Sequence, residues 1–180
     1  SWSVIIYLSL YFQVMLCLLT TKNLFELDSL LKSYLWMTLI LSSFYMAIPI
    51  RGWVEPLPNN NYFDHVMNWI RSVDMPSNSL PSGHVAYSLM GPFFFFAYGE
   101  EGDRKKWIFL LWGICISLST VTTKQHLIGD VFCGTILALA FGFIWGLYAR
   151  ERVFLRMKGY KLKIREKWRR KRARKKLMRR

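Results

Sequence analysis

Five long apolar runs, separated by short charged segments, constrain this chain more than any other feature of its sequence. They cover residues 4–20, 34–50, 84–98, 107–121 and 127–148. A helix needs roughly 17 to 25 residues to cross a bilayer, and the two shorter runs reach this length with a few flanking residues. A soluble helical bundle is the alternative, but it needs polar outer faces that these runs lack. We therefore expect an all-α, polytopic transmembrane helical bundle with five spanning helices.

The positive charges of the chain indicate how such a bundle is oriented. The formal net charge is +14, and 17 of the 25 lysines and arginines follow Tyr148. Five more lie in joints on the same side as the tail if each run crosses once, which leaves Arg51, Arg71 and Lys124 on the other side. By the positive-inside rule the C-terminal tail is cytoplasmic. The loop 51–83 and the turn 122–126 then lie on the non-cytoplasmic face of a multi-pass integral membrane protein.

Two regions follow from this topology. Residues 1–149 form the transmembrane domain, whose outer loop 51–83 carries part of the candidate site, and residues 150–180 form a basic cytoplasmic tail. The outer loop is rich in proline and asparagine, so we expect an ordered loop over the membrane face. Five crossings place Ser1 outside, and we expect these helices to be the last five of six. The three cysteines lie in apolar runs and are interpreted as small buried hydrophobic residues.

The first group of chemically active residues is the turn before the third apolar run. Pro81 ends any preceding helix, Ser82 is a good N-terminal cap, and Gly83 allows close backbone approach. Unpaired amide N–H groups and the positive end of the helix dipole then face the same point, where an anion can bind. His84 can deliver a proton there. A capped helix with an interfacial histidine, and no ligand, explains the same four residues.

The second group lies at the start of the last apolar run. His126 and Asp130 are four residues apart, so they share one face of a helix. The carboxylate can hold one ring nitrogen and leave the other as a nucleophile or base. A purely structural pair at the helix start is the alternative, although a carboxylate near a membrane is costly without a partner. Both groups face outward in the predicted topology, which favours the functional interpretation.

These two motifs resemble those of the type 2 phosphatidic acid phosphatase and vanadium haloperoxidase superfamily. Pro81-Ser82-Gly83-His84 reproduces the PSGH motif, and Ser119, His126 and Asp130 fit the motif S-R-x5-H-x3-D. The resemblance covers roughly residues 47–142. It implies a six-helix topology and an enzyme that needs neither a metal nor a cofactor.

The resemblance also implies a role for each site residue. His126 attacks phosphorus to give a phosphohistidine, Asp130 orients it, and His84 protonates the leaving oxygen and then helps to activate water. Ser82 and Gly83 hold the phosphoryl oxygens, and Ser119 belongs to the substrate-binding set. Cations offset the charge on those oxygens in the transition state.

The sequence departs from the superfamily at the cationic residues. Thr120 occupies the position of the expected arginine after Ser119, and no K-x6-R-P motif precedes Pro81. Lys124 and Arg51 are the foremost substitutes because both lie on the outward face, and Arg71 is a third candidate. Snorkelling of Lys124 and Arg51 to the interface is the alternative. His65, Asp74 and Asn78 in the same loop are interpreted as structural.

Three functions remain open from the sequence. The first is hydrolysis of a lipid phosphate monoester or pyrophosphate. The second is transfer of the phosphoryl-containing group to a lipid hydroxyl, because residues 119–126 resemble a divergent branch that includes inositol phosphorylceramide synthases. The third is a catalytically inactive scaffold that keeps the fold.

The basic tail has three possible interpretations. Lysines and arginines dominate residues 150–180. Next to a spanning helix such a segment binds anionic lipid headgroups, with each cation contributing about 1 kcal/mol near the surface. Nucleic-acid binding is less favoured because no nucleic-acid-binding motif is present. The third interpretation is a solvated segment that only enforces topology.

Overall fold

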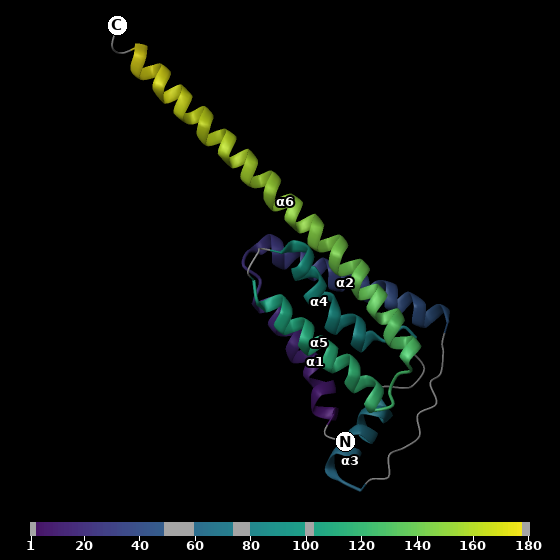
Figure 1. Ribbon diagram of the computed structural model, residues 1–180. Helices are drawn as coiled ribbons and strands as arrows, with labels where there is room; N and C mark the ends of the chain where they lie inside the picture. The colour runs from purple at the N-terminus through teal and green to yellow at the C-terminus, as the bar shows by residue number, and fades with distance from the viewer. Residues whose placement is uncertain (1–2, 49–59, 74–79, 100–102, 178–180) are drawn as a thin grey trace.

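The computed structural model describes residues 3–48, 60–73, 80–99 and 103–177, and this part of the chain is all-α. Its six helices are drawn in Figure 1. They are α1 (Ser3–Leu19), α2 (Leu24–Ala47), α3 (Tyr62–Val73), α4 (Gly83–Tyr98), α5 (Lys105–Thr122) and α6 (Ile128–Leu177). The predicted all-α fold is confirmed.

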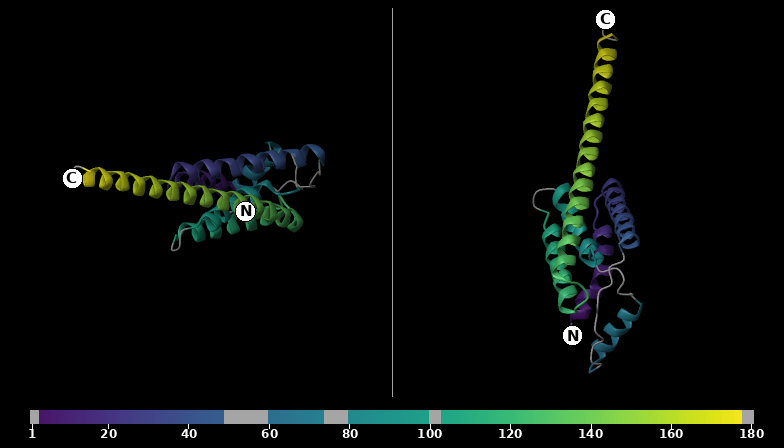
Figure 2. Two further views of the ribbon diagram at one scale, coloured as in Figure 1. Left: turned by 90° about the horizontal axis from the view of Figure 1, so that it is seen from above. Right: turned by 90° about the vertical axis from the view of Figure 1, so that its right-hand side faces the viewer.

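Each predicted apolar run corresponds to one helix, but the helix boundaries differ in two places. α2 begins ten residues before its apolar run because Asn23 caps it, accepting hydrogen bonds from the amides of Phe25 and Glu26. α6 continues to Leu177 without a break at residue 149, so it carries most of the basic tail. In Figures 1 and 2 this extension leaves the bundle as a single helix.

The outer loop contains a helix that the sequence analysis did not predict. α3 occupies Tyr62–Val73 and lies at the end of the bundle where α5 meets α6 (Figure 1). It is strongly amphipathic, with Met67 and Asp64 buried and Tyr62 and Trp69 exposed. A search for long apolar runs does not detect a short amphipathic helix with charges at both ends, because its sequence resembles a polar loop.

α4 is the central helix and makes its most extensive contact with α6. The face that α6 buries repeats every four residues with small side chains, namely Gly134, Ala138, Gly142 and Gly146. A methyl group at Gly142 would lie 2.8 Å from the carbonyl oxygen of Met90, and one at Gly146 would lie 2.6 Å from that of Phe94. The two backbones therefore approach more closely than any larger side chain allows.

A buried glutamine compensates for a proline inside α4. Pro92 has no amide N–H, so the carbonyl of Ser88 lacks its usual donor one turn later. Nε2 of Gln13 donates to this carbonyl at 3.2 Å and to the carbonyl of Phe109 at 2.9 Å. One side chain of α1 thereby joins α4 and α5 in the core of the bundle.

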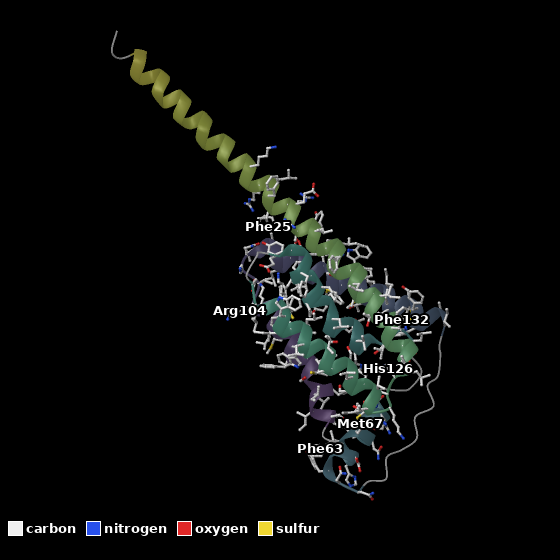
Figure 3. The ribbon with its side chains drawn as sticks, viewed as in Figure 1. Phe25, Phe63, Met67, Arg104, His126 and Phe132 are labelled. Carbon is white, nitrogen blue, oxygen red and sulfur yellow. The ribbon has the colours of Figure 1, made fainter. Side chains whose placement is uncertain are left out.

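Buried charges close the bundle at the end opposite His126. Figure 3 shows Phe25 and Arg104 at this end and His126 toward the other. Glu26 is fully buried and lies 3.1 Å from Nζ of Lys105. The Lys105 ammonium also contacts Asp103 and the face of the Phe95 ring. These contacts tie the first turn of α2 to the start of α5.

One described helix segment, Ile128–Arg156 of α6, is long and apolar enough to cross a membrane. Ser3–Leu19 is a shorter apolar helix. By this criterion alone the described residues give weak evidence for a membrane protein.

The glycine contact predicts a selective loss of stability. Gly146→Ala should lower the free energy of unfolding by about 1–3 kcal/mol, because the added methyl group meets backbone that cannot move aside. Thermal unfolding in detergent measures the effect. Gly159→Ala is the matched control, since it lies on the same helix with no atom within 4 Å of the added methyl group. It should be neutral or stabilising by up to about 1 kcal/mol. Equal effects of the two changes would contradict the packing argument.

Candidate active site

The first half of the site is the start of α4, which is fixed by a side-chain cap and by a hydrogen bond from α2. Ser82 is fully buried and caps the helix, its Oγ accepting from the amide of Val85. The hydroxyl of Tyr45 donates to the carbonyl of Pro81 at 2.7 Å. The amides of Gly83 and His84 have no acceptor one turn earlier in their own helix. They are therefore available to an anion at this helix start.

The second half is the turn between α5 and α6. The amide of Gln125 donates to the carbonyl of Thr120, and that of Lys124 donates to the carbonyl of Val121. This is the Schellman pattern, which requires a left-handed residue, and Lys124 has φ 53°. Glycine usually occupies this position, so a lysine there is strained by roughly 1 kcal/mol. The turn places His126 two residues before the start of α6.

Asp130 links the two halves. Its Oδ2 accepts from the amide of Leu127 at 2.9 Å and lies 3.6 Å from Nδ1 of His126. Its backbone carbonyl accepts from the amide of Ser82 at 3.1 Å. Gly134 permits this link, since a methyl group there would lie 2.6 Å from the carbonyl oxygen of Ser82. The two sequence motifs therefore meet through a backbone hydrogen bond.

The two predicted catalytic histidines lie side by side. The ring centroids of His84 and His126 are 6.0 Å apart. Nδ1 of His126 faces Asp130, which leaves Nε2 on the opposite side of the ring. Tyr7 of α1 also stacks on the His84 ring, at 4.3 Å between centroids. Sequence analysis did not identify Tyr7, because nothing in the sequence brings α1 to this turn.

The arginine that the structure brings to the site is Arg71 of α3. Its Nη2 donates to the carbonyl of Thr123 at 2.7 Å, directly beside the turn that carries His126. Burial lowers the pKa of Arg71, and the neighbouring Tyr7 partly opposes this shift. Arginine nevertheless remains protonated. The sequence analysis ranked this residue third among the cations.

The other predicted binding residues have different positions. Arg51, together with Asp74 and Asn78, lies outside the described residues. The side chain of Lys124 is exposed. Ser119 is buried, and its hydroxyl donates to the carbonyl of Ile116 in its own helix. Their roles toward a substrate stay predictions.

Gln125 is a further polar residue that sequence analysis missed. Its amide nitrogen Nε2 is buried and has no hydrogen-bond partner among the described residues. Because a buried unpaired donor is costly, a donor directly before His126 suits a site that receives an anion.

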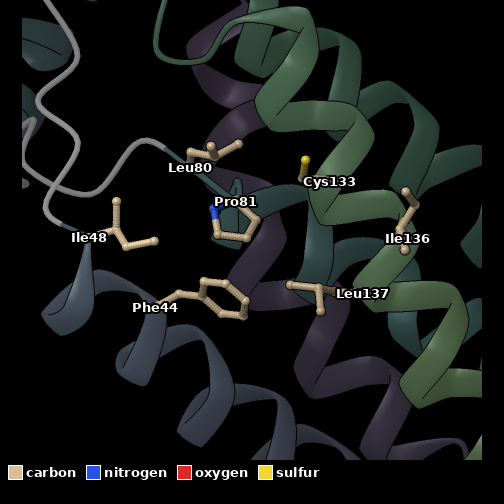
Figure 4. A pocket seen from close by; sticks show the side chains of 7 residues that line it. All are labelled: Phe44, Ile48, Leu80, Pro81, Cys133, Ile136 and Leu137. Atoms are coloured by element: carbon tan, nitrogen blue, oxygen red, sulfur yellow. The ribbon is translucent and has the colours of Figure 1, made fainter.

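An apolar cavity of about 270 Å³ lies immediately beside the start of α4. It is formed between α2, the Leu80–Pro81 segment and α6, as Figure 4 shows. Its lining consists of Phe44, Ile48, Leu80, Pro81, Cys133, Ile136 and Leu137. Pro81 thus contacts the cavity while the next residue caps α4.

Comparison with known proteins gives one result. The family model described as the PAP2 superfamily matches residues 7–154, which include every element of the site. No curated protein and no solved structure matches the chain. Among the described residues, no group of three or more His, Cys, Asp or Glu side chains could hold a metal ion.

The position of Arg71 predicts its effect on anion binding. Arg71→Lys should weaken binding of inorganic phosphate roughly 10-fold, because a hydrogen bond to a charged group contributes about 1.5–3 kcal/mol and lysine does not reproduce the guanidinium fork. Isothermal titration calorimetry measures the dissociation constant. Arg104→Lys, at the opposite end of the bundle, is the control. A loss in Lys124→Gln with none in Arg71→Lys would assign the anion to Lys124 instead.

Proposed function

Because the chain belongs to the PAP2 superfamily, whose members are generally phosphatases, we propose that it is an integral membrane phosphatase. It hydrolyses a lipid phosphate monoester or pyrophosphate on the non-cytoplasmic face. The observation that carries this proposal is the meeting of His84 with His126 and Asp130 at a capped helix start, with ring centroids 6.0 Å apart.

In the proposed reaction the substrate phosphate lies between the start of α4 and the turn before α6. Nε2 of His126 forms a bond to phosphorus while the bond to the leaving oxygen breaks. His84 gives its proton to that oxygen, and Asp130 stabilises the positive charge on the phosphohistidine. Water then attacks phosphorus, His84 takes its proton, and the electron pair returns to His126.

Hydrogen-bond donors around this position support the transfer. The amides of Gly83 and His84, the hydroxyl of Ser82 and the guanidinium of Arg71 stabilise the charge that spreads over the phosphoryl oxygens. Such electrostatic stabilisation is the main contribution of proteins to phosphoryl transfer. Arg71 takes the role of the arginine that Thr120 replaces, and Gln125 adds a buried donor beside His126.

The distribution of side chains supports insertion in a membrane. Buried positions between the helices include polar residues such as Gln13, Glu26, Ser33, Ser88 and Thr120. The outer surface carries large apolar side chains on α1, α2, α5 and α6, including Ile5, Phe12, Leu19, Leu35, Leu39, Ile108, Leu111, Leu118, Phe132, Ile144 and Leu147. Polar groups inside and apolar groups outside suit a hydrocarbon surrounding.

The tail fits the same arrangement. α6 continues from the apolar segment directly into the basic segment. With the tail cytoplasmic, the cations nearest to the bundle meet anionic lipid headgroups, and nucleic acid is not a partner.

A lipid phosphotransferase is the second candidate. It is favoured by Thr120 at the position of the expected arginine and by the apolar cavity beside Pro81, from which a lipid hydroxyl can replace water. The same three catalytic residues serve both reactions.

Phosphate release tests the proposed chemistry. The wild-type protein in detergent should release phosphate from a lipid phosphate in the presence of EDTA, and His126→Ala should lose at least about 10³-fold, as expected when a nucleophile is removed. His65→Ala is the control because His65 is exposed on α3. If no lipid phosphate is hydrolysed until an acceptor lipid is added, the transferase is the correct function. No reaction in either assay would indicate that the protein is a catalytically inactive scaffold.

The cavity predicts dependence on chain length. Ile136→Trp should fill part of the cavity and raise the KM for long-chain phosphates several-fold more than for short-chain ones, because a methylene removed from an apolar site costs about 0.8 kcal/mol. Ile144→Trp on the exposed face of α6 is the control. If the ratio of KM for long-chain phosphates to KM for short-chain phosphates is the same in both variants, the lipid chain does not bind in the cavity.

A further inference from the structure

We propose that Tyr7 is a positioning residue for His84, which fixes the nitrogen through which that histidine exchanges its proton. This inference rests on the proposed function, because it concerns the protonation of the leaving oxygen.

The geometry restricts the His84 ring in two ways. The Tyr7 ring stacks on it with an interplanar angle of 29° and a centroid distance of 4.3 Å, which limits rotation of the imidazole. The Tyr7 hydroxyl lies 3.3 Å from Nδ1. Tyr7 is only 2% exposed, so bulk water does not compete for this contact. The contact joins α1 to the first turn of α4.

The hydroxyl determines which nitrogen is used. In the charged form of His84, Nδ1–H donates to the Tyr7 oxygen and Nε2–H faces away from it. When Nε2 gives its proton to the leaving oxygen, the proton on Nδ1 stays with its acceptor. The neutral ring then has its lone pair on Nε2, where it can take a proton from the attacking water. One nitrogen thus serves first as acid and then as base.

Without the hydroxyl, the neutral ring can carry its proton on either nitrogen, and the charged ring loses its acceptor. Tyr7→Phe keeps the stacking surface and removes only the oxygen. It should lower kcat/KM for a long-chain alkyl phosphate roughly 10- to 100-fold, less than the 10²–10⁴ of general acid catalysis as a whole.

The leaving group separates this role from a structural one. An alkoxide needs a proton to depart, whereas a nitrophenolate does not. The comparison substrate is a nitrophenyl phosphate whose ring carries an alkyl chain of the same length. Because kcat/KM reports only the steps up to departure of the leaving group, Tyr7→Phe should leave kcat/KM for this substrate within about 3-fold of wild type. The ratio of kcat/KM for the alkyl phosphate to kcat/KM for the nitrophenyl phosphate, measured on one preparation, is independent of the fraction of folded protein. Tyr11→Phe, exposed one turn later on α1, is the matched control.

A loss confined to the alkyl phosphate supports the proposal. An equal loss on both substrates, or no loss on either, overturns it while the phosphatase function stands. A wild-type protein that releases phosphate from neither substrate contradicts the proposed function itself, and this result is separate from any effect of Tyr7.

Discussion

The close approach of α4 and α6 is the contact on which the rest of the structure depends. Small residues at four-residue intervals along α6 let its backbone lie directly on α4. At the end of this contact, Gly134 leaves room for the carbonyl of Ser82, whose amide donates to the carbonyl of Asp130. Two motifs more than forty residues apart in sequence therefore share one rigid junction. A larger residue at Gly134 would separate the start of α4 from the segment that carries His126 and Asp130.

The same close packing leaves little room for unpaired polar groups, and the core shows how these are paired. The carbonyl freed by Pro92 is bound by Gln13, and the buried Glu26 carboxylate is bound by Lys105 and by the amide of Lys22. The contacts of Gln13 and Lys105 each join two different helices. Polar pairing thus adds to the apolar core in fixing the relative positions of the helices, while many large apolar side chains face outward.

The sequence located five of the six described helices and the two motifs that the structure brings together, but not the residues that surround these motifs. The apolar runs locate five helices because apolar runs of this length rarely form any other structure. The four-residue spacing of His126 and Asp130 places them on one face of a helix. α3 was missed because an amphipathic helix of 12 residues has no long apolar run. The length of α6 was missed because a change from apolar to basic residues marks a change of environment and not the end of a helix. Tyr7 comes close to His84, and Arg71 comes close to Thr123, only through tertiary packing, which no local pattern encodes.

Arg71, which we propose as the replacement for the arginine expected at Thr120, comes from a different helix. Thr120 is fully buried in the last turn of α5, and its carbonyl accepts from the amides of Gln125 and His126, so its backbone holds the turn that follows the helix. The guanidinium comes instead from α3, which reaches the carbonyl of Thr123 from outside the bundle. A cation on α5 itself would be fixed by the helix, whereas Arg71 is fixed only while α3 stays docked. The position of this guanidinium therefore depends on the packing of α3, in which Met67 is fully buried.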